Sequence, residues 1–392
     1  MKITFRPLLQ KRRLMLAGGA LFLVGLLIWH PVSAHFRAAR LVVKMAKIAL
    51  HDSPILNTHP PIVETVLAFP NPQTGHPIRA RLYAPQNVTS GPGMVLIHGV
   101  HRLGMDEPRL MAFARAFSTT GLIILTPEIT ELADYHISSQ SIQTIGTTTQ
   151  FLSQKLGQSQ VGLMGLSFAG GLALLAAGDA RYKSSIQYVV SVGGHHDLAR
   201  VAQFFATNQI PLPDGSIQKL TAHPYGPLII VYSNLAHFFP PKDLPQAHEI
   251  LKLWLWEQFD QAKQQLPTLS PESQKKMGLL FEGKIDQFAP ELLKEIENLR
   301  PDMKLVSPNG QLQAMSVPVF LLHGELDPVI PVAEAKWLIK EIPPNPGNHV
   351  LISKCIGHVE LQGEPSFSEV WQLVHFVAEI LSRAGKDGEA DG

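Results

Sequence analysis

The sequence has almost no cysteine and no surplus of charge of either sign. Cys355 is the only cysteine in 392 residues, so no intrachain disulfide can form and a disulfide-stapled fold is excluded. The 33 lysines and arginines balance the 32 aspartates and glutamates, and no long basic block occurs beyond the first residues. Because nucleic-acid binding needs a concentrated positive patch, nucleic acid is not expected as a partner.

Charged residues are also missing from Leu14 to Trp29, directly after a basic N-terminus. A positive flank followed by an apolar run is typical of a signal peptide or a membrane anchor, and we predict one of these for residues 1–34. The run is short for a membrane span of about 20 residues. Val32-Ser33-Ala34 resembles a cleavage site. Both alternatives place the rest of the chain outside the cytoplasm, either exported or anchored to a membrane.

Residues 35–61 continue this basic segment and then form a proline-bearing linker. Their first half has an amphipathic pattern that would suit a membrane surface, with the apolar residues Phe36, Leu41, Val43 and Ile48. A membrane partner through the N-terminal segment is therefore expected.

Short apolar segments then alternate with segments of helical periodicity. Residues 62–69 and 78–83 flank a Pro- and Gly-bearing turn, which predicts a hairpin. Further strands are predicted at 94–97, 122–125, 161–166, 186–192, 317–322 and 349–352, and helices at 106–119, 138–156, 168–180, 332–341 and 367–383. Such alternation predicts an α/β fold, with a mostly parallel sheet flanked by helices.

The alternation is interrupted between residues 197 and 316. Helical patterns dominate there, for example at 248–265 and 290–299, and only 228–232 has the apolar character of a strand. We therefore predict a largely helical cap at 197–316, inserted between the two parts of the core. The core parts are 62–196 and 317–384, and 385–392 is a polar tail predicted to be disordered.

Residues 161–171 read Val-Gly-Leu-Met-Gly-Leu-Ser-Phe-Ala-Gly-Gly. An apolar strand, a serine and then small residues opening a helix are typical of a nucleophile elbow, a sharp turn that exposes a serine hydroxyl above a sheet. The positions two before and two after Ser167 must be small, because strand and helix approach closely there. Gly165 and Ala169 meet this requirement, although Ala169 stands where the usual motif has glycine.

A serine nucleophile needs a histidine base, which is itself oriented by a carboxylate. Downstream of Ser167, Asp327 and His358 each follow the end of a predicted strand. Since the carboxyl ends of parallel strands share one edge of a sheet, we expect the three side chains to meet there. Asp197, in the loop after an earlier strand, is the alternative acid.

Two other histidines, His98 and His101, are interpreted as structural or pocket-lining residues. The run His195-His196-Asp197 resembles a metal site by composition alone. It lacks a second spaced pair of ligands, so no metal is expected.

With these motifs the sequence resembles the α/β-hydrolase superfamily, in particular its dienelactone-hydrolase-like and prolyl-oligopeptidase-like branches. The resemblance covers residues 62–383 and depends on four motifs: His98-Gly99, Gly165 to Gly170, His323-Gly324 through Asp327-Pro328, and Gly357-His358. It implies an oxyanion hole made by the backbone N–H of Phe168 together with that of Val100 or Gly99.

The resemblance also implies a function and the partners that go with it. We expect a serine hydrolase that cleaves carboxylic esters through an acyl-enzyme intermediate. Its substrates would be small-molecule or lipid-like esters, and it would need no cofactor. The alternatives are a peptidase or an acyltransferase on the same triad, or a non-catalytic binding module with a hydrolase fold.

Overall fold

The computed structural model describes residues 31–45, 59–363 and 365–385. Its centre is an eight-stranded sheet with the order β1-β2-β4-β3-β5-β6-β9-β10. The strands are β1 (Ile62–Pro70), β2 (Pro77–Pro85), β3 (Gly93–Ile97), β4 (Ile123–Pro127), β5 (Val161–Leu166), β6 (Ile186–Val192), β9 (Val319–Gly324) and β10 (His349–Ser353). β1 and β2 form the predicted antiparallel hairpin, β2 pairs antiparallel with β4, and all other neighbours are parallel. The predicted fold class is confirmed.

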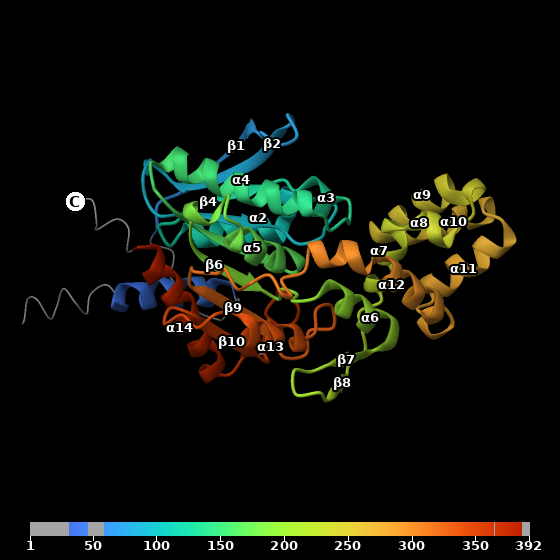
Figure 1. Cartoon of the computed structure of the whole chain (residues 1–392). Coiled ribbons are helices and arrows are strands. Elements are labelled where there is room, and N and C mark those ends of the chain that lie inside the picture. The colour runs from blue at the N-terminus through green and yellow to red at the C-terminus, as the bar shows by residue number, and fades with distance from the viewer. Residues whose placement is uncertain (1–30, 46–58, 364, 386–392) are drawn as a thin grey trace, which may run out of the picture.

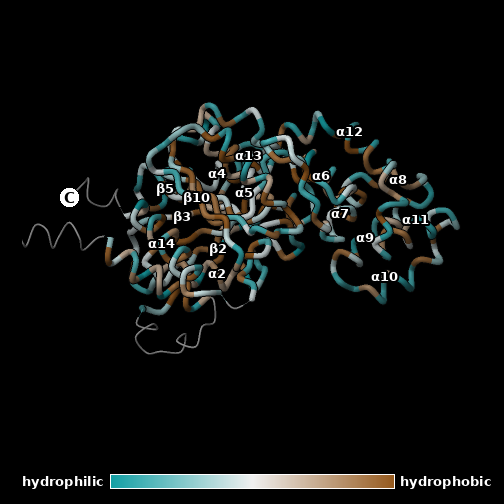
Figure 2. The backbone as a smooth tube through the Cα atoms, turned by 90° about the horizontal axis from the view of Figure 1, so that it is seen from below, coloured by the Kyte–Doolittle hydropathy of each residue, from teal (hydrophilic) through white to brown (hydrophobic). Residues whose placement is uncertain are grey.

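Helices cover both faces of this sheet (Figure 1). The helices are α2 (Pro108–Ser118), α4 (Ser139–Leu156), α5 (Phe168–Gly178), α13 (Val332–Glu341) and α14 (Phe367–Ala384). α4 and α5 pack on one face, while α2, α14 and a helix over residues 31–45 pack on the other. In β5, Leu163 faces the first layer and Met164 the second, as the two-residue period of a strand requires. Because both faces are covered, the central strands are apolar throughout, which Figure 2 shows as brown segments in the middle of the core.

Residues 197–316, which we call the cap, contribute Leu312 and Met315 to the core cluster and otherwise form a group of helices at one end of the core (Figure 1). They are α6 (Leu198–Thr207), α7 (Tyr225–Ser233), α8 (Leu235–Phe238), α9 (Leu244–Leu255), α10 (Phe259–Gln265), α11 (Pro271–Phe281) and α12 (Ala289–Leu305). A short hairpin of β7 (Gln209–Pro211) and β8 (Ile217–Lys219), which was not predicted, follows α6. The cap helices share a hydrophobic cluster of their own, and it extends to core residues such as Phe168 and Ile330.

Two predictions within the cap are wrong. Residues 228–232 are part of helix α7 and not a strand, because a short apolar run buried on all sides has no periodicity that distinguishes the two. Residues 248–265 do not form one helix: α9 ends at Leu255, and Glu257 adopts a left-handed conformation (φ 62°) before α10 begins.

The helix over residues 31–45 packs against α14 and the sheet. It is therefore not a free amphipathic segment. Ala34, Ala38 and Leu41 are buried, and the Arg37 guanidinium donates a hydrogen bond to the Thr120 carbonyl at 2.9 Å. The interpretation that Leu41 faces a membrane is therefore wrong, since protein covers this side chain.

Residues 1–30, 46–58 and 386–392, which hold the predicted apolar N-terminal run, most of the linker and the tail, lie outside the described residues. Among the described residues, no helix combines the length and the apolar character needed to cross a membrane.

Candidate active site

Ser167 lies in the sharp turn between β5 and α5. Its backbone has φ 57° and ψ −137°, a strained combination for a residue with a side chain. A Cβ atom on Gly165 would lie 2.2 Å from the carbonyl oxygen of Ala169, so only glycine allows strand and helix to approach this closely. Ala169 is fully buried, and the alanine is accommodated where the usual motif has glycine. The turn has the geometry of a nucleophile elbow.

His358 lies between Ser167 and Asp327. Its Nε2 is 2.6 Å from the Ser167 Oγ, and its Nδ1 is 2.7 Å from the Asp327 Oδ2. In the tautomer that both contacts require, the imidazole Nδ1–H donates to the carboxylate and Nε2 accepts from the hydroxyl. Asp327 follows β9 and His358 follows β10, so the carboxyl edge of the sheet brings the three side chains together.

The Asp327 carboxylate is buried completely, and hydrogen bonds hold both of its oxygens. Oδ1 accepts from the backbone N–H groups of Val329 (2.8 Å) and Ile330 (2.9 Å), which leaves Oδ2 for His358. The buried imidazole of His323 donates to the Ile330 carbonyl at 2.7 Å and fixes the same turn. The carboxylate therefore has one orientation, and in it the negative charge faces His358.

The loop after β3 passes directly beside the serine. A Cβ atom on Gly99 would lie 3.1 Å from the Cβ of Ser167, so the backbone of this loop is in contact with the elbow. His98 anchors the loop: its Nδ1 donates to the Gly99 carbonyl (2.7 Å) and its Nε2 accepts from the Ile129 N–H (3.0 Å). Burial lowers the pKa of His98 to about 4, which keeps the imidazole neutral and able to make both contacts.

The two predicted oxyanion donors lie on either side of Ser167. Phe168 is the first residue of α5, so its N–H has no acceptor within the helix and belongs to the positive end of the helix dipole. Val100 directly follows Gly99 in the neighbouring loop and is half-buried between the core and the cap. The oxyanion role of both residues remains a prediction.

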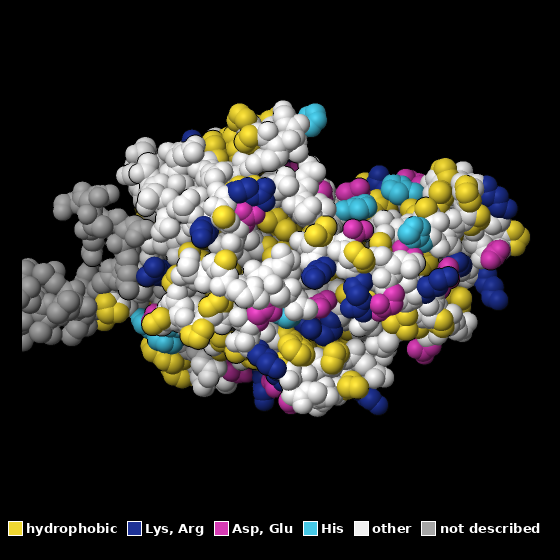
Figure 3. Space-filling model, in the orientation of Figure 1, with side chains coloured by type: hydrophobic (Ala, Val, Ile, Leu, Met, Phe, Trp, Pro, Cys, Tyr) yellow, Lys and Arg dark blue, Asp and Glu magenta, His cyan; other side chains and the backbone are white. Residues whose placement is uncertain are grey.

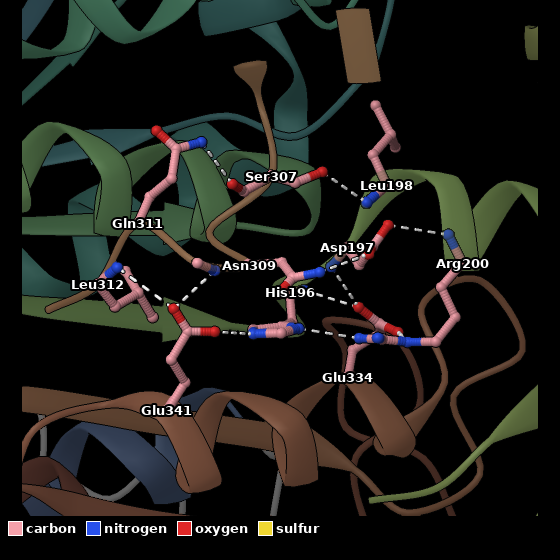
Figure 4. Close-up of polar contacts among 11 residues, drawn as sticks. His196, Asp197, Leu198, Arg200, Ser307, Asn309, Gln311, Leu312, Glu334 and Glu341 are labelled. Atoms are coloured by element: carbon pink, nitrogen blue, oxygen red, sulfur yellow. Dashed lines mark hydrogen bonds and ion pairs between the residues drawn. The ribbon is translucent and has the colours of Figure 1, made fainter. Parts of the chain in front are cut away.

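Asp197, the alternative acid, belongs to a different network (Figure 4). It caps the start of α6 by accepting a hydrogen bond from the Arg200 N–H at 3.1 Å, and it accepts from Asn309 Nδ2 at 2.8 Å. Burial alone would raise the pKa of Asp197, but the hydrogen bonds from Asn309 and Arg200 outweigh it and lower the pKa. The structure pairs His358 with Asp327 and gives Asp197 this capping position.

The neighbouring histidines also have partners within the protein. His195 Nε2 donates to the Val306 carbonyl at 2.8 Å, and His196 Nε2 donates to Glu341 Oε2 at 2.5 Å. Within the described part of the chain, no group of three or more His, Cys, Asp or Glu side chains is placed to hold a metal ion.

Two residues with positive φ were not singled out in the sequence. Gly193, after β6, has φ +61°, and a Cβ atom there would lie 2.8 Å from the His358 carbonyl oxygen. Tyr135, also at positive φ (62°), donates from its hydroxyl to the Leu255 carbonyl of the cap at 3.1 Å. The glycine pair Gly193-Gly194 at the end of an apolar strand could have indicated Gly193 from the sequence, whereas no local pattern indicates Tyr135.

Comparison with known proteins agrees with the observed fold. A family model described as alpha/beta hydrolase fold matches residues 143–359, more than half of the chain. The chain belongs to the α/β-hydrolase family. The resemblance inferred from the four motifs is thus confirmed. No curated protein matches the sequence.

Several solved structures are similar to this chain at low identity. The esterase domain of a Rhodothermus marinus protein is 16% identical over 82% of this chain and 96% of its own, with a TM-score of 0.43. An esterase of Pyrobaculum calidifontis is 16% identical over 90% and 91% (TM-score 0.46). A dienelactone hydrolase of Anabaena variabilis is 14% identical over 81% and 96% (TM-score 0.42). Similarity this distant carries no information on substrate.

Proposed function

We propose that this α/β-hydrolase cleaves carboxylic esters with Ser167 as nucleophile, His358 as base and Asp327 as the acid of a catalytic triad. The observation that carries the proposal is the continuous hydrogen-bond chain from Oγ through the imidazole to Oδ2, with 2.6 and 2.7 Å between heavy atoms. These distances lie within the reach required for proton transfer from a nucleophile to its base.

In the first half of the reaction, His358 Nε2 takes the Ser167 proton while Oγ attacks the ester carbonyl carbon. The carbonyl oxygen becomes an oxyanion, which the N–H groups of Phe168 and Val100 would stabilise. A single donor of this kind is typically worth about 3 to 4 kcal/mol of barrier. Collapse of the tetrahedral intermediate releases the alcohol, which takes its proton from His358, and leaves an acyl group on Ser167.

In the second half, water replaces the alcohol. His358 removes a proton from the water, the resulting hydroxide attacks the acyl carbonyl, and collapse returns the proton to the Ser167 oxygen as the carboxylic acid leaves. Throughout, Asp327 keeps its negative charge and stabilises the imidazolium form of His358. The two residues that supply the proposed oxyanion donors, Val100 and Phe168, have apolar side chains, which favours an apolar acyl group.

The test combines an active-site probe with a substrate series. A fluorophosphonate should label the wild-type chain and fail to label Ser167→Ala, and equal labelling of both would remove Ser167 from the mechanism. p-Nitrophenyl esters of graded acyl length then test ester hydrolysis. Turnover of peptide amides in place of every ester would make the chain a peptidase.

We further propose that residues 1–34 export the chain or anchor it, so that the hydrolase acts outside the cytoplasm. The basic N-terminus followed by the uncharged run Leu14 to Trp29 supports this placement. A protease added to intact cells should digest the hydrolase domain only if it is outside the cytoplasmic membrane.

A further inference from the structure

Large apolar side chains are exposed on two neighbouring helices at the end of the core opposite the cap. Phe367 and Trp371, one turn apart on α14, are 85% and 54% exposed. Val32 and Phe36, one turn apart on the helix over residues 31–45, are each 52% exposed. Figure 3 shows hydrophobic side chains gathered over α14 at the lower left. We call these four residues the apolar face.

The two pairs belong to one surface, because the helices touch between them. The His35 ring stacks on Trp371 with 6.0 Å between ring centroids, and its Nε2 lies 3.1 Å from His375 Nδ1. Behind this contact, Ala34 and Ala38 are buried against α14 and its neighbours. The helix therefore has one side in the protein core and the opposite side, with Val32 and Phe36, in solvent.

The sequence next to the apolar face indicates what covers it. The described chain begins at Pro31, whose carbonyl accepts a hydrogen bond from His35 Nδ1 at 2.7 Å, so residues 1–30 are attached to this face. The uncharged apolar run Leu14 to Trp29 ends two residues earlier. An apolar run of this kind partitions into the hydrocarbon of a bilayer, and it would bring the face to the bilayer surface.

The charge around the face suits an anionic lipid surface. Residues 31–45 carry Arg40 and Lys44 after Phe36 and no acidic residue, whereas the Arg37 guanidinium is turned inward to the Thr120 carbonyl. On α14, the Glu369 carboxylate between Phe367 and Trp371 accepts hydrogen bonds from Ser366. The Arg40 guanidinium lies 5.9 Å from the centre of the exposed Phe36 ring. Basic side chains beside exposed aromatic rings are the pattern of helices that lie in the interfacial layer of a membrane, and tryptophan is enriched at that depth.

Resting on the membrane-anchor alternative proposed above for residues 1–34, we propose that the apolar face docks on the surface of an anionic lipid bilayer while the N-terminal run inserts into it. Val32, Phe36, Phe367 and Trp371 then enter the interfacial layer, and α14 lies against the bilayer. Figures 1 and 2 place α14 at one end of the molecule and the cap helices α8 to α11 at the other. Docking therefore holds the cap in the aqueous phase, where its substrates would reach it.

The experiment measures where a label on the face lies. Full-length Phe367→Cys is labelled with an environment-sensitive fluorophore and incorporated into vesicles of phosphatidylcholine and phosphatidylglycerol. The matched control is Phe259→Cys on α10 of the cap, also an exposed phenylalanine (43%). Cys355 is buried and should take up little label, which the unsubstituted chain checks.

Nitroxide groups on the lipids should quench the label at 367 several-fold more strongly than the label at 259, and aqueous iodide should show the reverse preference. Adding Trp371→Glu and Phe36→Glu to Phe367→Cys should abolish the difference while the N-terminal run keeps the chain on the vesicles. Equal quenching at both positions would overturn the proposal. So would energy transfer between labels on different molecules, because a second copy would then cover the face. Fluorophosphonate labelling of Ser167 monitors the fold independently of docking.

Discussion

Replacing Asp327 by Asn tests the triad with little change in shape. In the wild type, Oδ1 accepts from the N–H groups of Val329 and Ile330, and Oδ2 accepts from His358 Nδ1–H. The Asn side chain keeps both backbone hydrogen bonds only if its carbonyl oxygen takes the Oδ1 position. Its NH₂ group then points at His358, where it can only donate.

A donor at that position forces the His358 imidazole into its other tautomer. Nδ1 must then accept, so the proton moves to Nε2, which can no longer take the proton of Ser167. The imidazolium that forms during attack also loses its negative neighbour. Together these losses should lower the reactivity of Ser167 about 1,000- to 10,000-fold, which corresponds to about 4 to 5.5 kcal/mol at the transition state.

The assay is the second-order rate of fluorophosphonate labelling, which needs no knowledge of the natural substrate, together with thermal unfolding. Asp197→Asn is the matched control, because asparagine caps a helix about as well as aspartate. We expect it to lower stability slightly and to leave labelling within about twofold, since the structure pairs Asp197 with Arg200 and Asn309. A larger loss at Asp197 than at Asp327 would refute the assignment of the acid.

Three further changes have distinct expected results. Gly193→Ala places a Cβ 2.8 Å from the His358 carbonyl at φ +61°, so labelling should slow about 10- to 100-fold; an unchanged rate would contradict the packing. Burial lowers the pKa of His98 from 6.5 to about 4, so its stabilisation is complete above pH 6.5 and is lost as the pH falls toward 4. At pH 5 the loss in free energy of unfolding is about 2 kcal/mol. Urea unfolding at several pH values should therefore show a free energy of unfolding that depends less on pH in His98→Asn than in the wild type. An equal pH dependence in the two proteins would contradict this. Tyr135→Phe leaves the Leu255 carbonyl without its donor and should lower the free energy of unfolding by about 1 to 3 kcal/mol, measured by urea titration; a stability equal to wild type would count against this bond.

The sheet was predictable because its strands are short, apolar and bounded by turn residues. The strand predicted at 349–352 is β10 (His349–Ser353). The helix predicted at 332–341 is α13, and its observed bounds equal the predicted ones. Burial on both faces makes the central strands continuously apolar, and the helices between the strands keep one apolar side, so the two periods remain distinct.

The candidate triad could be proposed from the sequence because each of its residues follows the end of a strand. Ser167, Asp327 and His358 are far apart in sequence, yet the parallel sheet leaves their loops at one edge, where the structure brings them within hydrogen-bond distance. The residues that contact these three side chains were harder to predict. The contact of Gly193 with His358 depends on the path of two loops that no local pattern defines, and the same holds for His98 with Ile129.

The cap was the least predictable region, and its contacts explain why. Its helices pack around a shared cluster in which α7 is buried from every side, so local periodicity is lost. The same cluster includes Phe168, which directly follows Ser167, and Ile330, which lies in the turn that holds Asp327. The backbone N–H of His223 in the cap donates to the Pro328 carbonyl, next to Asp327, at 2.8 Å. The cap therefore touches both the turn of Ser167 and the turn of Asp327.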